Sequence, residues 1–235
     1  MAKKEAGSNT CGLYIISPPH FKLLTFCDLL KSALEGLNEV PGAADHAAFQ
    51  LRLKQGDDDD ILRAAERMKP ICDDAGVVFI LNDRVDLVQK TGVNGVHIGQ
   101  EDGADRPGYI AEVRKTLGEK AIIGVSCYDS KHLAMEAAEE GADYVSFGAF
   151  FPSTTKKDPK GHPNKEILEW WSTFTVVPCV AIGGINQENC GELVRAGADF
   201  IAAVSAIWTS PDSPREAVKD FLTEIERAKT ATLRH

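Results

Sequence analysis

A regular alternation of short apolar runs with amphipathic stretches limits the fold of this chain more than any other feature. The stretches between the runs have helical patterning: the one at 57–76 begins on four aspartates, which suit a helix N-terminus, and ends on a glycine, which suits a helix C-terminus. Strands that alternate with helices form a parallel sheet. The runs that we expect to be strands are LYIIS (13–17), AFQLRL (48–53), VVFILN (77–82), GVHIG (95–99), IIGVSC (122–127), YVSFG (144–148), CVAIGG (179–184) and FIAAVSA (200–206).

Three similar segments within the sequence, which we call the internal echo, support this pattern. The segments VNGVHIG, GADYVSFG and GADFIAAVS each follow or contain a helix-ending glycine and lead into a buried strand; the glycines are Gly92, Gly141 and Gly197, at successive offsets of 49 and 56 residues. Each offset spans about two strand–helix units, and eight units in about 200 residues predict a closed (β/α)8 TIM barrel. A doubly wound open sheet is the alternative, but it usually has fewer units, and the first turn, SPPHF, has no G-x-G-x-x-G.

The chain has no internal linker, so we expect a single domain. The expected parts are a flexible N-terminal segment at 1–12, the barrel at 13–228 and a C-terminal tail at 229–235. Hydrophobic residues make up 43% of the chain, enough for a large core. The six cysteines are scattered without C-x-x-C spacing, which is typical of buried, reduced thiols in a cytoplasmic protein.

The charge balance narrows the range of partners. A net charge of −9 and a pI near 5.2 argue against a general affinity for nucleic acid or anionic membranes. No apolar run approaches the roughly 20 residues that span a bilayer, and the start, MAKKEAGSNT, lacks the apolar segment of a secretory signal. We therefore expect a cytoplasmic protein that acts on small molecules and that could assemble as a homo-oligomer.

Polar residues at the C-terminal ends of the strands are the candidates for function, because active sites of such barrels lie there. In FQLRLK, period-two alternation puts Gln50, Arg52 and Lys54 on one face and the leucines on the other. A stripe of this kind would be costly inside a barrel unless a ligand or partner satisfies it. The alternative is that Lys54 has already left the strand into solvent.

Two carboxylates follow neighbouring strands. Asp83 comes directly after the strand that ends at Asn82, and Asp102 lies three residues past Gly99. Since neighbouring strands lie about 4.8 Å apart, the two carboxylates can share one ion. A site with few protein oxygens suits Mg²⁺ that also binds substrate phosphates. Helix capping by the same aspartates is an alternative of equal weight.

The loop after the sixth strand has hydroxyl groups and positive charge, which suit a phosphate. Ser126 ends the fifth strand, and His97 lies within GVHIG, where a hydrogen-bonded histidine of the barrel wall is a simpler reading than a general base. The polar residues of the loop that we single out are Ser153, Thr154, Thr155 and Lys156.

The last two strands also end in groups that suit an anion. Gly183 and Gly184 let the backbone approach a ligand closely, and Val204 and Ser205 lead into a short segment that can offer N–H groups. The loops after the seventh and eighth strands are the usual phosphate cradle of this fold. A plain tight turn is the alternative for the two glycines.

Seven blocks of the sequence stand in a specific order and spacing: QLRLK, NDRVDLV, GVHIGQED, GVSCYD, GADYVSFGAFFPSTTKK, VAIGGI and GADFIAAVSAI. They resemble the thiamine-phosphate synthase family, and the resemblance covers roughly residues 13–207. It implies a barrel enzyme of thiamine biosynthesis, a transferase that joins an aminopyrimidine hydroxymethyl diphosphate to a hydroxyethylthiazole phosphate. The products would be thiamine phosphate and diphosphate, formed by Mg²⁺-assisted dissociative displacement.

The resemblance also implies roles for individual residues. The metal ligands would be Asp83 and Asp102, and the catalytic residues would be Arg52, Lys54, Ser126 and Lys156. The pyrimidine diphosphate would be bound by Gln50, Arg52, Lys54, Asn82, Ser126 and Lys156. The thiazole phosphate would be bound by Ser153, Thr154, Thr155, Gly184, Val204 and Ser205.

The chain departs from the family pattern in a few places. Ser153 stands where the family usually has threonine and keeps the hydroxyl, and Leu53 replaces a usual glutamate at a position expected to point outward. The insertion at 158–164 and the turn SPPH have no assigned role.

Two rival functions stay open. A thiazole tautomerase paralogue would lack the diphosphate and metal residues and would use a histidine near the end of the fifth strand, where this chain has Ser126 and Cys127. A non-catalytic barrel that binds phosphate ligands would bind without turnover. A sugar-phosphate isomerase needs a positioned acid–base pair, and the strand ends offer no evident candidate.

Overall fold

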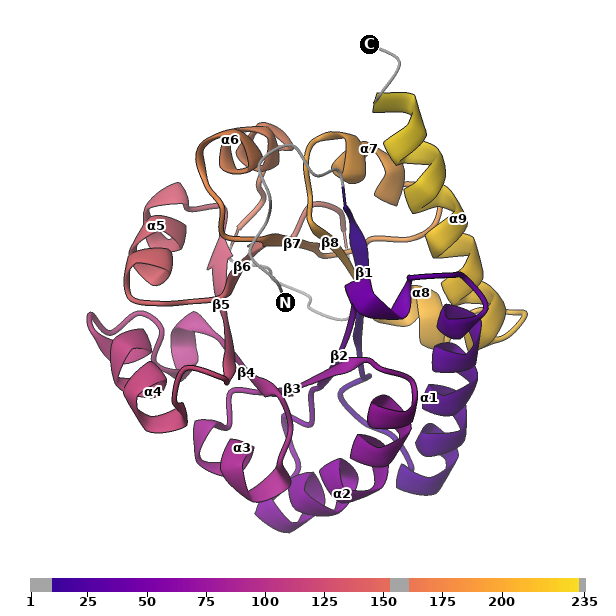
Figure 1. Ribbon diagram of the computed structural model, residues 1–235, viewed down its shortest axis with the longest axis horizontal. Coiled ribbons are helices and arrows are strands. Elements are labelled where there is room, and N and C mark those ends of the chain that lie inside the picture. Colours follow the sequence, from indigo (N-terminus) through magenta and orange to yellow (C-terminus); the bar gives the residue numbers. More distant parts are fainter. Residues whose placement is uncertain (1–9, 153–160, 233–235) are drawn as a thin grey trace.

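The computed structural model describes residues 10–152 and 161–232 of the chain. Within them, parallel strands follow one another in sequence order around a closed barrel, and β1 pairs with both β2 and β8. Figure 1 shows the strands at the centre of a ring of helices. The predicted (β/α)8 barrel is thus confirmed. The strands are β1 (Gly12–Ile16), β2 (Ala47–Leu51), β3 (Val78–Asn82), β4 (Gly95–Ile98), β5 (Ile122–Tyr128), β6 (Tyr144–Gly148), β7 (Cys179–Ile182) and β8 (Phe200–Ala203).

The helices form the outer layer of the barrel. The aspartate run starts α2 as predicted, because Asp57 caps the helix by accepting a hydrogen bond of 2.8 Å from the Asp60 N–H. None of the helices in the described ranges is long and apolar enough to cross a membrane. The helices are α1 (Leu23–Asn38), α2 (Asp58–Asp74), α3 (Val85–Thr91), α4 (Tyr109–Leu117), α5 (Lys131–Glu139), α6 (Glu166–Phe174), α7 (Cys190–Arg195), α8 (Ser205–Trp208) and α9 (Pro214–Thr232), with 3-10 turns η1 (Ala44–His46) and η2 (Gln100–Asp102).

Several strands end earlier than their apolar runs predict. β2 stops at Leu51, β7 at Ile182 and β8 at Ala203. The residues beyond these points leave the ladder and form the rim that carries the site. At the other end of the chain, α9 continues to Thr232, so the boundary that we expect between barrel and tail, after residue 228, falls inside this helix.

Alternation along the strands separates two cores. The larger core lies between the strands and the helices and includes Leu51 and five buried cysteines, with Leu53 and Cys27 packed against it as partly buried residues. The smaller core fills the barrel itself and contains Tyr14, Tyr144 and Phe200. Leu53 therefore points outward, as alternation predicts, while polar neighbours from the same strand face the barrel axis.

The internal echo of the sequence has a structural cause at the N-terminal end of the barrel. Gly92, Gly141 and Gly197 all have positive φ, at 66°, 103° and 97°, as helix-ending glycines require. Two residues after each of these glycines, an Asn or Asp directly precedes β4, β6 or β8. Its side chain accepts a hydrogen bond from an N–H of the strand before it, and its own N–H donates to the carbonyl of the same residue. The pairs are Asn94 with Phe79, Asp143 with Ile123 and Asp199 with Cys179, with side-chain bonds of 2.7, 2.8 and 2.9 Å.

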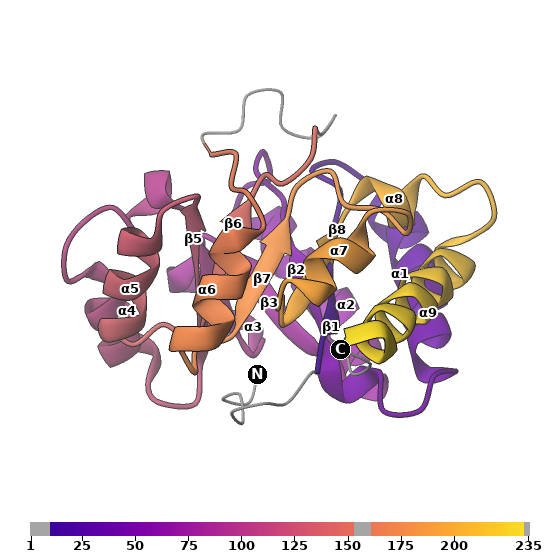
Figure 2. The same cartoon turned by 90° about the horizontal axis from the view of Figure 1, so that it is seen from above.

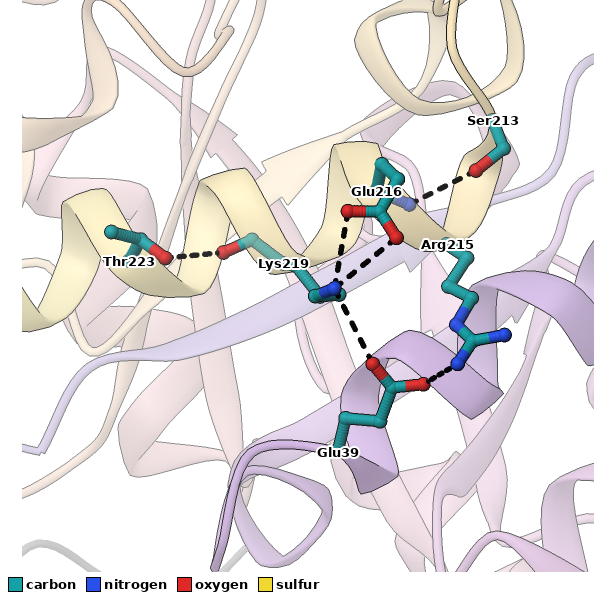
Figure 3. A network of polar contacts seen from close by, with 6 residues as sticks. All are labelled: Glu39, Ser213, Arg215, Glu216, Lys219 and Thr223. Atoms are coloured by element: carbon teal, nitrogen blue, oxygen red, sulfur yellow. Dashed lines mark hydrogen bonds and ion pairs between the residues drawn. The ribbon is translucent and has the colours of Figure 1, made fainter.

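An ion cluster joins the first and last long helices of the barrel. Figure 3 shows Glu39, just past α1, between Arg215 and Lys219 of α9; the Lys219 Nζ lies 3.4 Å from Glu39 and 3.1 Å from Glu216. These side chains are partly exposed, so solvent screens the ion pairs and each adds little to stability. Close packing of the same helices is more important: a Cβ on Gly36 of α1 would lie 2.4 Å from the Arg215 carbonyl oxygen.

Candidate active site

One pocket lies at the C-terminal end of the barrel, and all the strands contribute to it. Figure 2 shows the barrel from the side, with α8 at the upper edge, where the strands end. The polar residues that line the pocket are Ser17, Gln50, Arg52, Lys54, Asn82, Asp83, His97, Gln100, Glu101, Asp102, Ser126, Tyr128, Ser146 and Ser205.

The polar stripe of the second strand enters this pocket. Gln50 is the last inward residue of β2 and is buried, while Arg52 and Lys54 follow it into the loop and become progressively more exposed. The start of the loop is held in place, because the Arg52 N–H donates to the Ser17 Oγ at 2.9 Å. Lys54 has left the strand and is exposed, but it also lines the pocket.

Two carboxylates meet above β3 and β4. Asp83 directly follows β3 with a left-handed φ of 64°, and its Oδ1 accepts the Gly99 N–H at 3.0 Å. The Lys54 Nζ lies 3.8 Å from Asp83 Oδ2 and 4.0 Å from Asp102 Oδ2. A Cβ on Gly99 would lie 2.7 Å from the Asp102 carboxylate. Glycine at position 99 thus leaves room for the two carboxylates to approach each other.

The capping alternative for the two aspartates is wrong. The N-cap of α3 is Arg84, without a side-chain capping bond, so Asp83 does not cap the helix that follows it. Asp102 lies in η2, whose N-cap is Gly99, and α4 starts only after Gly108. Neither carboxylate is used as a helix cap, and both line the pocket.

The two carboxylates are close enough for the charge of one to act on the other. Burial raises the pKa of Asp83, and the neighbouring charge of Asp102 raises it further. Burial lowers the pKa of Arg52, but the two carboxylates oppose that shift and an arginine remains charged at neutral pH. A pair of carboxylates held together in this way favours a divalent cation, which would offset their mutual repulsion.

Below the rim, a buried polar chain crosses the barrel interior. Tyr14 donates to Gln50 Oε1 at 2.9 Å and lies 2.7 Å from the Tyr144 hydroxyl. His97 contacts Tyr144 through Nδ1 at 3.0 Å and Ser126 through Nε2 at 2.9 Å. Burial, together with the charge of Arg52, lowers the pKa of His97 to about 4, so the ring is neutral at pH 7. The reading of His97 as a hydrogen-bonded wall residue agrees with these contacts.

The opposite edge of the pocket is lined by backbone. Gly183 and Gly184 have φ of 104° and 64°, and a Cβ on Gly184 would lie 2.3 Å from the Pro152 carbonyl oxygen. The glycines therefore turn tightly and also pack against the loop after β6. Val204 and Ser205 lie in the same pocket, where Ser205 is the first residue of α8 and its N–H is one of the donors that a helix start leaves unpaired.

The structure brings together every described residue that the sequence singled out. These lining residues are Gln50, Arg52, Lys54, Asn82, Asp83, Asp102, Ser126, Gly184, Val204 and Ser205. The other candidates lie outside the described residues: Ser153, Thr154, Thr155 and Lys156.

Sequence reasoning missed four residues that contribute to the site. Tyr14 and Tyr144 carry the polar chain, Gln100 donates to the Ser126 carbonyl at 2.6 Å, and Ser146 lines the pocket floor. The run YVSFG contained a usable signal, because alternation puts Tyr144, Ser146 and Gly148 on one face.

Comparison with known proteins agrees with this geometry. Residues 13–207 match the model of a family described as thiamine monophosphate synthase. A thiamine-phosphate synthase of Rhodospirillum centenum is 50% identical over 211 residues, which cover 90% of this chain and 96% of that protein. The thiamine-phosphate synthase of Erythrobacter litoralis is 45% identical over 217 residues, covering 92% and 96%. Among solved structures, a thiamine phosphate pyrophosphorylase from Pyrococcus furiosus superimposes with a TM-score of 0.74 at 29% identity, over 92% of this chain and 96% of that one.

Proposed function

The chain belongs to the thiamine monophosphate synthase family, and we propose that it joins an aminopyrimidine hydroxymethyl diphosphate to a hydroxyethylthiazole phosphate, releasing diphosphate and thiamine phosphate. As a family member it is an enzyme of thiamine biosynthesis, a transferase. The observation that carries the proposed reaction is the composition of one pocket: carboxylates and cations at one edge, and glycine backbone at the other.

The carboxylate edge suits a diphosphate with its metal. Asp83 and Asp102 would hold Mg²⁺, since the two side chains lie together beside Lys54 and supply hard oxygen ligands. Bound there, Mg²⁺ would neutralise charge on the diphosphate leaving group. Arg52 and Lys54 would bind the same diphosphate, and Asn82 would position its neighbour Asp83 through the hydrogen bond from its amide to that carboxylate.

The reaction needs charge stabilisation rather than a protein nucleophile. The bond between the pyrimidine methylene carbon and the diphosphate oxygen breaks, and its electron pair leaves with the diphosphate. The thiazole nitrogen then donates its lone pair to the same carbon, which produces the thiazolium product. Arg52 and Lys54 would stabilise the charge that develops on the leaving group. Neutral His97 has both nitrogens engaged, which fits a mechanism without a general base.

The glycine edge suits the thiazole phosphate. Gly184, Val204 and Ser205 would contact the phosphate through backbone N–H groups. The family resemblance adds Ser153, Thr154 and Thr155 to this cradle and puts Lys156 on the diphosphate. Both substrates would then lie in one pocket, and we expect them to react in the cytoplasm without nucleic acid or membrane partners.

A turnover assay tests the proposal. Diphosphate release is followed with both substrates, with each substrate alone, and with EDTA in place of Mg²⁺. We expect release only with both substrates and Mg²⁺. Binding of the thiazole phosphate without turnover would instead indicate a tautomerase-like paralogue or a non-catalytic phosphate-binding barrel.

A further inference from the structure

A single chain of hydrogen bonds connects the two edges of the pocket floor. It starts at the Asp83 carboxylate, crosses the barrel and ends at the Ser126 hydroxyl. Among the described residues, no buried side-chain nitrogen or oxygen lacks a partner. The members in order are Asp83, Asn82, Gln50, Tyr14, Tyr144, His97 and Ser126.

The first half of the chain has its direction set by the carboxylate. An ionised carboxylate only accepts, so Asn82 must offer Asp83 its Nδ2 and keep its Oδ1 for Gln50. Gln50 therefore donates through Nε2 to that oxygen at 2.6 Å, which leaves Oε1 to accept from the Tyr14 hydroxyl at 2.9 Å. Each amide has one orientation that satisfies both neighbours.

The second half follows from counting protons. A tyrosine hydroxyl has one proton, and Tyr14 gives its proton to Gln50, so the 2.7 Å contact requires Tyr144 to donate to Tyr14. Tyr144 must then accept from His97 Nδ1–H at 3.0 Å. A neutral imidazole has a single N–H, so Nε2 is an acceptor and takes the proton of Ser126 at 2.9 Å.

The opposite direction conflicts with the first member. Reversing every bond would turn the Asn82 carbonyl oxygen toward the Asp83 carboxylate, and both would be acceptors. The chain of hydrogen bonds therefore has one direction. Its last member, Ser126, donates its only hydroxyl proton to His97 Nε2. Toward the pocket, Ser126 offers lone pairs alone.

We propose that Tyr14, Tyr144 and His97 are positioning residues that hold Ser126 as a hydrogen-bond acceptor, and that this polarity selects a heterocycle presenting an N–H donor at that point. The inference rests on the proposed function, which supplies an aminopyrimidine as the substrate. Gln50 Nε2 has a second proton beyond the one given to Asn82 and lines the same pocket. The floor thus presents an acceptor at Ser126 and a donor at Gln50.

An aminopyrimidine carries the two complementary groups, since its amino group donates and its adjacent ring nitrogen accepts. Replacing the amino group by an oxo group inverts both positions: the substituent becomes an acceptor and the ring nitrogen carries a proton. A site whose buried polar groups have a fixed direction rejects such an analogue strongly. The oxo pyrimidine diphosphate is therefore the probe of this polarity.

The tautomer of His97 can be measured without any activity. Two-bond proton–nitrogen NMR on protein with labelled histidine distinguishes a ring protonated at Nδ1 from one protonated at Nε2. The His97 signals are assigned by their change in Ser126→Ala. We expect the proton on Nδ1, at pH 7.5 with Mg²⁺ present, and a proton on Nε2 would overturn the proposal even if the enzyme is fully active.

Competition binding measures the selection itself. We expect the wild type to bind the amino pyrimidine diphosphate at least about 100-fold more tightly than the oxo form. Tyr144→Phe cuts the chain and should reduce this ratio about tenfold, as should Tyr14→Phe if the first variant does not fold. Tyr109→Phe, on α4 and outside the chain, is the control and should leave the ratio unchanged.

The two possible failures are distinguishable. If the wild type binds neither pyrimidine diphosphate, the proposed function is wrong. If the wild type turns over the amino substrate but Tyr144→Phe and Tyr14→Phe keep the full binding ratio, the function stands and the positioning role is refuted.

Discussion

The two ends of the barrel use similar side chains for opposite purposes. At the N-terminal end, Asp143 and Asp199 each accept a main-chain N–H of a neighbouring strand, and Arg114 also donates to Asp143. At the C-terminal end, Asp83 and Asp102 lie beside each other, and burial together with the charge of Asp102 raises the pKa of Asp83. Carboxylates that accept hydrogen bonds from a neighbouring strand link the two strands and stabilise the fold. Acids that repel each other in a pocket are arranged for a ligand.

This division agrees with a general property of (β/α)8 barrels, in which the C-terminal face carries chemistry and the N-terminal face carries stability. The repeated glycine and Asn or Asp motif belongs to the stable face, although it precedes strands that deliver site residues at their other ends. Variants of the two ends should therefore separate activity from stability.

The largest effect is expected for Asp83→Ala. Loss of one of two carboxylates should lower kcat/KM on the order of 10³-fold, which is about 4 kcal/mol of transition-state stabilisation. Alanine also removes the acceptor of the Gly99 N–H at a left-handed φ, so we expect a lower Tm as well, with a smaller drop than in Asp199→Ala because Asp83 is only partly buried. Steady-state diphosphate release and thermal unfolding measure the two quantities. Asp86→Ala is the control. Asp86 lies three residues after Asp83, is exposed and forms an ion pair with Arg84. Equal losses in both variants would contradict the account.

Asp199→Ala should show the reverse pattern. It removes the acceptor for the Cys179 N–H at a position that is 6% exposed, so we expect a loss of about 2–3 kcal/mol in the free energy of unfolding. Denaturant unfolding measures that loss, and kcat/KM at 20 °C should stay within about twofold. Asp199→Asn keeps an acceptor oxygen and should recover part of the stability. A large loss of activity in folded Asp199→Ala would show that the two ends are not independent.

Gly99→Ala perturbs the C-terminal end without removing a charge. The φ of Gly99 is −77°, which alanine adopts readily, but its Cβ would lie 2.7 Å from the Asp102 carboxylate. Displacement of that carboxylate should lower kcat/KM about 10- to 100-fold and raise the Mg²⁺ concentration needed for half-maximal rate. Gly56→Ala, where the nearest atom would be 3.3 Å away, is the control. An unchanged Mg²⁺ requirement would remove Asp102 from the metal site.

The smallest effect is expected for Asn94→Ala at the N-terminal end. Asn94 is exposed and makes a neutral hydrogen bond of 2.7 Å to the Phe79 N–H, so its loss should cost about 1 kcal/mol in unfolding free energy. Asp199→Ala should therefore lose more unfolding free energy than Asn94→Ala. Chemical denaturation of both variants checks that order, and the reverse order would show that burial does not decide the cost.

The sequence predicted the elements well because their signal is local. Apolar runs, helix-ending glycines and the aspartate cap of α2 are visible in neighbouring residues, and alternation was enough to place Gln50 inward and Leu53 outward. Strand ends were predicted less well, because polar and glycine residues such as Arg52 and Gly183 continue the apparent strand after its ladder has ended.

The buried polar chain could not be predicted from local patterns. The contact between Tyr14 and Tyr144 joins residues 130 positions apart, and its existence depends on how β1 and β6 face each other across a closed barrel. The insertion after β6 is a similar case. Its described end returns to the strand, since the Gly161 carbonyl accepts the Ala149 N–H at 2.9 Å.

The most direct test of this division is the thermal shift that Mg²⁺ and inorganic diphosphate produce in three proteins: wild type, Asp83→Ala and Asp199→Ala. Ligand stabilisation depends on affinity and ligand concentration, and reaches about 2.7 kcal/mol at 100 times Kd. We predict that Asp199→Ala has a lower Tm but nearly the same free-energy gain as the wild type on adding the ligands, whereas Asp83→Ala loses the gain whatever its Tm without ligands. A full gain in Asp83→Ala, or a lost gain in Asp199→Ala, would contradict the assignment of ligand binding to one end of the barrel and stability to the other.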